Sequence, residues 1–171
     1  MVNDEIICID TIDVKPHLSM SLALTILPTG ELALFSGGTD LKFTLFLSDS
    51  KTACTFKKIL SLDGHSDWIR SINIAKYTGS SSSSGMSPGD LMIATASQDK
   101  YIRIWKVGPQ DKNLLSDTID ILGEDTLIST KSHVFGKANY TVMLNAISLG
   151  HDDWVFSINW NPVILNGVCS T

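Results

Sequence analysis

The stretch "GHSDWIRSIN" at residues 64–73 returns almost unchanged as "GHDDWVFSIN" at residues 150–159. The two copies differ at three of their ten positions, and His65 and His151 lie 86 residues apart. Self-similarity at a fixed spacing is the sequence signature of stacked structural units. A Gly-His pair followed by an acid and a tryptophan, present twice, therefore predicts a repeat protein.

The most regular unit covers residues 55–106. It contains four short apolar segments with turn residues between them, at residues 56–62, 69–75, 91–97 and 101–106. The 42 residues from Gly64 to Trp105, counting both ends, match the period of one four-stranded β-propeller blade. We therefore expect a blade over residues 55–106, with a Ser-rich surface loop at residues 78–90.

The flanking sequence fits the same frame less regularly. Residues 5–54 are interpreted as a degenerate blade that begins with a strand at Glu5 to Val14. In this blade, "GGTD" at residues 37–40 supplies the tight turn and Phe46 stands at the tryptophan position. Residues 107–140 are an insertion of mixed character, and residues 141–171 begin the next blade. No stretch of the sequence keeps apolar residues at the spacing of an α-helix face for three turns. The predicted fold is all-β, a propeller fragment of about two and a half four-stranded antiparallel blades.

Composition restricts the functional classes. The 171 residues are 43% hydrophobic and 18% charged with a net charge of -5, a globular balance that disfavours non-specific phosphate binding. Without a transmembrane run or a signal peptide, we expect a cytoplasmic and nuclear protein. Neither the three distant cysteines, Cys8, Cys54 and Cys169, nor the histidines have metal-ligand spacing. We expect neither metal nor cofactor.

Four side chains of the regular unit are expected to form a structural network. His65 would donate to Asp99 in the turn between the third and fourth strands. Ser97, or Thr95 two residues earlier on the same face, would join His65 to the indole N–H of Trp105. Each of these polar groups needs a partner once it is buried. His151 is the corresponding histidine of the next blade.

Ser97, His65 and Asp99 also have the residue types of a catalytic triad. A nucleophile needs exposure and an oxyanion hole, and the sequence has no Gly-x-Ser-x-Gly elbow. The structural network uses the same three residues and Trp105 as well, so we expect a protein that is not an enzyme. A hydrolase that uses His65 and Ser97 is the rival hypothesis.

Trp68 and Trp154 each lie three residues after their histidine, at a position on the blade rim. Aromatic side chains are enriched in binding sites, which suggests contact with a partner. Packing against a neighbouring blade explains them equally well. Both interpretations stay open from the sequence.

Taken together, "GHSDWIRSIN", "SQDKYIRIWK" and, after the insertion, "NAISLGHDDWVFSINWNP" resemble WD repeats, although Lys106 stands where the family has an aspartate. More narrowly, their order over about residues 20–162 is similar to the Elongator complex protein 2 family. Its members are several times longer, with two propellers, so the resemblance implies a partial chain.

The resemblance to that family implies a non-catalytic scaffold. Its propellers hold together the large scaffold subunit and the radical-SAM acetyltransferase subunit of a complex that modifies wobble uridines of tRNA. A WD-repeat adaptor of another intracellular complex is the alternative. Direct RNA binding is a further possibility, which the acidic composition disfavours.

Overall fold

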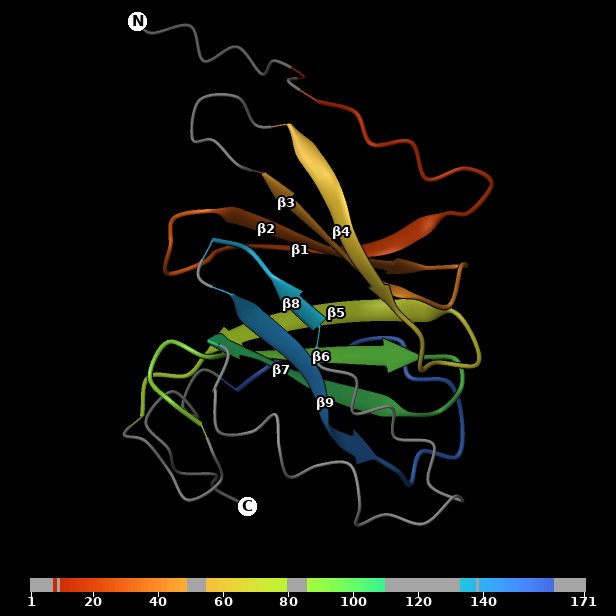
Figure 1. The fold of residues 1–171 in the computed structure, drawn as a ribbon. Helices are drawn as coiled ribbons and strands as arrows, with labels where there is room; N and C mark the ends of the chain where they lie inside the picture. The colour runs from red at the N-terminus through yellow and green to blue at the C-terminus, as the bar shows by residue number, and fades with distance from the viewer. Residues whose placement is uncertain are drawn as a thin grey trace, which may run out of the picture.

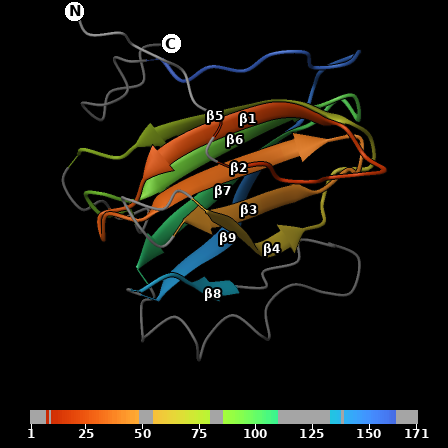
Figure 2. The ribbon, with the colours of Figure 1, turned by 90° about the horizontal axis from the view of Figure 1, so that it is seen from above.

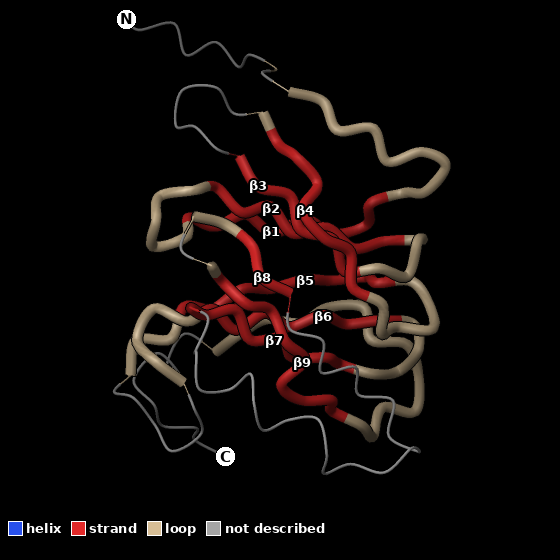
Figure 3. Tube along the Cα trace, in the orientation of Figure 1, coloured by secondary structure: helices blue, strands red, loops and turns tan. Residues whose placement is uncertain are grey.

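Every secondary-structure element in the described part of the chain is a β-strand (Figure 3). The computed structural model describes residues 8, 10–48, 55–79, 86–109, 133–137 and 139–161. No helix among these residues is long and apolar enough to cross a membrane. Nine strands form two antiparallel sheets, which confirms the all-β prediction.

The first sheet has four strands in the order β1-β2-β3-β4. Their bounds are Ser19–Ile26, Leu32–Gly38, Phe43–Ser48 and Phe56–Leu62. β3 is buried along its whole length, whereas β1 alternates between exposed and half-buried residues. The alternation follows from the two-residue period of a strand, which sends successive side chains to opposite faces.

The second sheet has five strands in the order β5-β6-β7-β9-β8. Their bounds are Ile69–Lys76, Leu91–Ser97, Ile102–Pro109, Tyr140–Ser148 and His133–Phe135, for β5, β6, β7, β9 and β8 respectively. Buried Glu31 of the first sheet accepts hydrogen bonds from Thr29 Oγ1 (2.8 Å) and from the backbone N–H of Lys137 (3.1 Å). This carboxylate joins the β1-β2 turn to the β8-β9 turn.

The two sheets stack face to face, with β1 lying along β5 (Figures 1 and 2). One core runs through both sheets. Phe43 is at its centre, because it stacks on Phe35 of its own sheet (5.3 Å between ring centroids) and on Trp105 of the other (5.2 Å). Gly37 on β2 allows a close approach of the sheets, since a Cβ there would lie 2.6 Å from Ile69 Cγ2.

Each sheet is one structural unit, and its first strand, β1 or β5, is its inner strand. Hydrogen bonds between successive inner strands fix how the units follow one another. The N–H of Ile72 on β5 donates to Ser21 Oγ on β1 (2.9 Å). One unit later, the N–H of Ile158 donates to Ser71 Oγ (3.3 Å). Residues 151–161 therefore run along β5 as β5 runs along β1, and begin a third unit.

Asn73 adds a second set of bonds to this third unit. Its Oδ1 accepts from the N–H of Trp160 (3.3 Å), and its backbone oxygen accepts from the indole of Trp160 (3.2 Å). Its amide nitrogen donates to Asn159 Oδ1 (3.0 Å). The "SIN" triplet shared by both copies thus contains the residues that hold successive units in register.

The four segments of residues 55–106, which were expected to form one blade, are divided between the two sheets. Residues 56–62 pair with β3 and complete the first sheet, and residues 140–148 pair with β7 and complete the second. Each sheet would otherwise end in a strand with unpaired backbone groups, and a later segment of the chain, β4 or β9, covers that edge. The repeat in sequence is therefore offset from the sheet by one strand.

Other expected segments differ in detail. Described residues 10–18 hold no strand, although a strand was expected up to Val14. Within the expected insertion 107–140, β7 extends to Pro109 and β8 covers His133–Phe135. Residues 80–85 of the Ser-rich loop and 110–132 of the insertion lie outside the described residues.

Gly37→Ala tests the contact between the sheets. A Cβ there would lie 2.6 Å from Ile69 Cγ2 and 3.1 Å from Ile72 Cδ1, so either these side chains or the sheets must shift. We expect a loss of about 1–3 kcal/mol in the free energy of unfolding, measured with urea. Gly64→Ala is the control, since its Cβ would come no closer than 3.3 Å to Arg103 and 3.4 Å to Trp105. Equal losses in the two variants would contradict the packing described here.

Candidate functional site: a buried histidine network below an aromatic rim

His65 lies at the centre of a chain of buried polar side chains. Its Nδ1 donates to Asp99 Oδ2 (2.8 Å) and its Nε2 accepts from the Thr95 hydroxyl (2.8 Å). Thr95 Oγ1 also accepts from the indole N–H of Trp105 (3.0 Å). The structure thus brings together His65, Asp99 and Trp105, three of the residues expected from the sequence.

Arg103 is a member of this network that the sequence reasoning missed. Its NH1 donates to Asp99 Oδ2 (3.0 Å) and lies 2.7 Å from His65 Nδ1. Its guanidinium also lies over the ring of Tyr101, 5.7 Å from the ring centroid. The four-residue spacing from Asp99 was the available signal, because the tight connection between Ser97 and Ile102 brings these positions together.

Charge and burial fix the protonation states. Burial lowers the pKa of His65 below its ordinary value of 6.5; the bond to Asp99 opposes this and Arg103 reinforces it. Burial alone would raise the pKa of Asp99, but hydrogen bonds from His65 and the backbone of Ser66 and Tyr101 hold it well below 3.8. A neutral imidazole therefore lies beside an ionised carboxylate at neutral pH.

The bridging residue is Thr95, and the expected role of Ser97 is corrected. Ser97 is fully buried; its hydroxyl donates to the carbonyl of Asp67 (2.9 Å) and accepts from the N–H of Asp99 (3.0 Å). Both residues point to one face of β6, but Ser97 lies at its end and holds the turn. His65, Asp99 and Ser97 therefore do not form the nucleophile–base pair of a hydrolase.

His151 does not repeat the environment of His65. It is exposed, and no Asp–Thr–Trp set surrounds it among the described residues. His65 depends on β6 and β7 for its partners, so a Gly-His pair alone does not create the network. Among the residues that the structure describes, none surrounds His151 as β6 and β7 surround His65.

Lys106, at the position of the family aspartate, has its own acidic partner. Its ammonium lies 3.1 Å from the buried carboxylate of Asp90, which also accepts from the N–H of Ser87 (2.8 Å). A Cβ at Gly108 would lie 2.5 Å from Asp90 Oδ1, so this position needs glycine. Lys106, which replaces the aspartate of the WD pattern, is thus paired with the Asp90 carboxylate.

The two repeat tryptophans are exposed at the sheet edge. Trp68 is 42% exposed and Trp154 is 49% exposed, so packing against the described residues does not bury them. Trp154 packs edgewise against exposed Phe156 (5.9 Å), and the Arg70 guanidinium covers Phe156 (5.3 Å). We call Trp68, Arg70, Trp154 and Phe156 the aromatic rim.

The buried network and the aromatic rim differ in whether their polar and aromatic groups already have partners. Among the described residues, no group of three or more His, Cys, Asp or Glu side chains could hold a metal ion. Every buried side-chain nitrogen or oxygen in the described part of the chain has a hydrogen-bond partner. The network is satisfied internally, whereas the aromatic rim faces outward.

The two repeat histidines should contribute differently to stability, because only His65 has buried hydrogen-bond partners among the described residues. His65→Ala leaves the Asp99 carboxylate and the Thr95 hydroxyl without their shared partner, so we expect a loss of about 2–4 kcal/mol in unfolding free energy. His151→Ala is the matched control and should change stability by less than about 0.5 kcal/mol. Urea unfolding measures both, and similar losses would contradict the network.

Stability should also fall below neutral pH because of His65. Its lowered pKa means that the unfolded chain takes up a proton below pH 6.5 before the folded chain does. In His65→Gln, the decline in unfolding free energy between pH 7.5 and 5 should therefore be shallower than in the unchanged chain, by up to about 1.4 kcal/mol per pH unit. The other histidines are common to both chains, so parallel pH profiles would refute the assignment.

Comparison with known proteins agrees with this geometry. The sequence model of the protein family described as "WD domain, G-beta repeat" matches residues 56–106 of this chain. These residues include the whole His65 network. Elongator complex protein 2 from Dictyostelium discoideum is 35% identical over 91% of this chain, and that from Arabidopsis thaliana is 34% identical over 95%. The human protein is 30% identical over 93%.

These alignments cover 19%, 19% and 18% of the three relatives, so the chain spans about a fifth of their length. The matched region runs through both sheets and the start of the third unit. With its antiparallel sheets and its WD-repeat network, the chain belongs to the Elongator complex protein 2 family of WD-repeat proteins.

Proposed function

We propose that this chain is a non-catalytic scaffold segment that binds other subunits of an Elongator complex. The observation that carries the proposal is the division between a satisfied interior and an exposed aromatic rim. Of the residues with triad chemistry, His65 is buried and bonded to Asp99 and Thr95. Ser97 is also buried, but its hydroxyl donates to the carbonyl of Asp67 instead of meeting His65. Large aromatic side chains next to a guanidinium are the residue types that dominate protein interfaces.

The name of the matched relatives supports an Elongator assembly as the setting. We further propose that the large scaffold subunit and the radical-SAM acetyltransferase subunit are the partners, and that tRNA wobble-uridine modification is the process served. Affinity purification of the tagged chain from cells of its source tests this. Recovery of the large scaffold subunit supports the proposal; recovery of an unrelated complex instead would favour the general adaptor.

The aromatic rim should be the contact surface. We expect the double variant Trp68→Ala and Trp154→Ala to lose most of the recovered subunits, because truncation of an interface aromatic costs about 2 kcal/mol or more of binding free energy. Ile59→Ala on β4 is the control, since Ile59 is also 42% exposed but lies outside the rim. Quantitative mass spectrometry gives the ratio, and equal recovery from both variants would exclude the rim.

A further inference from the structure

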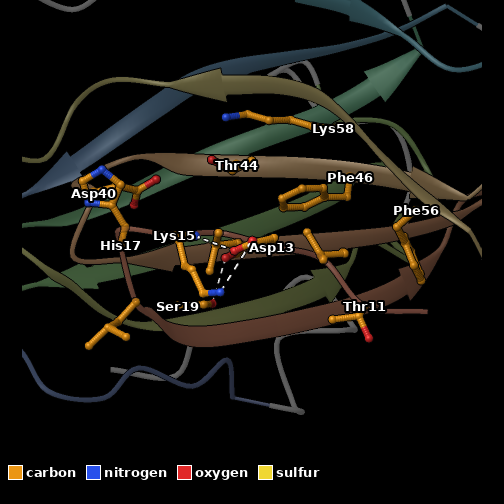
Figure 4. A pocket seen from close by; sticks show the side chains of 14 residues that line it. Thr11, Asp13, Lys15, His17, Ser19, Asp40, Thr44, Phe46, Phe56 and Lys58 are labelled. Carbon is orange, nitrogen blue, oxygen red and sulfur yellow. Dashed lines mark hydrogen bonds and ion pairs between the residues drawn. The ribbon is translucent and has the colours of Figure 1, made fainter. Parts of the chain in front are cut away.

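A cavity of about 470 Å³ lies on the first sheet, beside the N-terminal segment at residues 11–18 (Figure 4). Ser36 and Thr44, which pair across β2 and β3, line it. Thr95 and Arg103 pair in the same way across β6 and β7. The cavity therefore occupies, on the first sheet, the place that the His65 network fills on the second.

The acid at this place is held by the same turn in both sheets. Asp40 and Asp99 each precede a residue with a left-handed backbone, with φ of 65° at Leu41 and 71° at Lys100. In each turn, the backbone N–H two positions after the acid donates to its carboxylate, at 3.3 Å and 3.0 Å respectively. The Asp40 carboxylate thus corresponds to that of Asp99.

What differs is the set of side chains around the carboxylate. Asp99 receives the imidazole of His65 and the guanidinium of Arg103. Asp40 lines the cavity with only the turn N–H bonded to it among the described residues, because Thr44 replaces the arginine. Its other oxygen can accept further hydrogen bonds.

The remaining walls suit a long side chain with a cationic end. Phe46 and Phe56 lie toward one end of the cavity, and Asp40 and His17 lie toward the other (Figure 4). An aliphatic stem can pack on the aromatic rings while its charged head meets the carboxylate. A planar guanidinium matches a carboxylate with two parallel hydrogen bonds, which an ammonium cannot do.

Three other charged groups line the cavity. Lys15 lies 3.9 Å from Asp13, so these two opposite charges are paired. Lys58 is exposed on β4, where its ammonium can stay in water. Of the two acids that line the cavity, Asp40 is therefore the one without a cationic partner among the described residues.

We propose that this cavity binds an arginine side chain of a partner protein, with its guanidinium at Asp40 as Arg103 lies at Asp99. The site is separate from the aromatic rim and does not depend on which complex the chain joins. A partner would thus complete on the first sheet a charged contact that the second sheet makes internally.

The test uses the peptide acetyl-Gly-Arg-Gly-amide and the 171-residue chain, followed by the amide NMR signal of Lys42, whose N–H bonds to Asp40. We expect a saturable shift, and a citrulline peptide of the same shape should bind about tenfold more weakly because it lacks the charge. Asp40→Asn should weaken arginine binding by a similar factor. Lys58→Gln removes a charge of opposite sign from the same cavity, and should leave binding equal or tighter.

Thr44→Arg supplies the missing guanidinium within the chain. We expect it to abolish peptide binding, because its guanidinium would lie at Asp40 as that of Arg103 lies at Asp99. The substitution also removes the hydrogen bond between the Thr44 and Ser61 hydroxyls (2.8 Å), so the melting temperature is measured to check that the variant is folded. Equal binding of the arginine and citrulline peptides, or unchanged binding to Asp40→Asn, would overturn the proposal. Binding that Lys58→Gln abolishes, or that inorganic phosphate displaces, would show an anion site and refute it as well.

Discussion

The structure depends on one buried contact, the imidazole of His65 between the Asp99 carboxylate and the Thr95 hydroxyl. His65 belongs to the segment that leads into β5, whereas its partners belong to β6 and the turn that follows it. The apolar core alone would hold these segments together without fixing their relative position, since burial is non-directional. Two short hydrogen bonds with fixed geometry supply that position, and burial makes their loss costly.

Trp105 extends this control to the other sheet. Its indole N–H bonds to Thr95, while its ring stacks on Phe43 of β3. The orientation that the network imposes on the ring therefore determines the surface on which the first sheet packs. A phenylalanine at this position has no side-chain N–H to donate, and Phe46 is the residue at the equivalent place on the first sheet.

The repeat made the fold class, His65, Asp99 and Trp105 predictable, because their spacing is set by strand and turn geometry. The choice between Thr95 and Ser97 was not predictable, since residues two apart share a face and only depth in the sheet separates their roles. Strand pairing also escaped prediction: residues 56–62 precede the Gly-His pair in sequence but satisfy the edge of the sheet before it. Contacts between units, such as those of Asn73, need coordinates, because periodicity describes each strand separately.

Serine at equivalent positions explains how the units keep their order. Ser21 and Ser71 each accept a backbone N–H from the following inner strand. A strand's side chains alternate with a period of two, so a slip of one residue would place the hydroxyl on the wrong face and expose apolar neighbours such as Ile72. A one-residue slip in register would therefore break the hydrogen bond to the serine and the apolar packing together. This agreement allows a weakly conforming first sheet, which lacks the histidine network, to stack in register on the second.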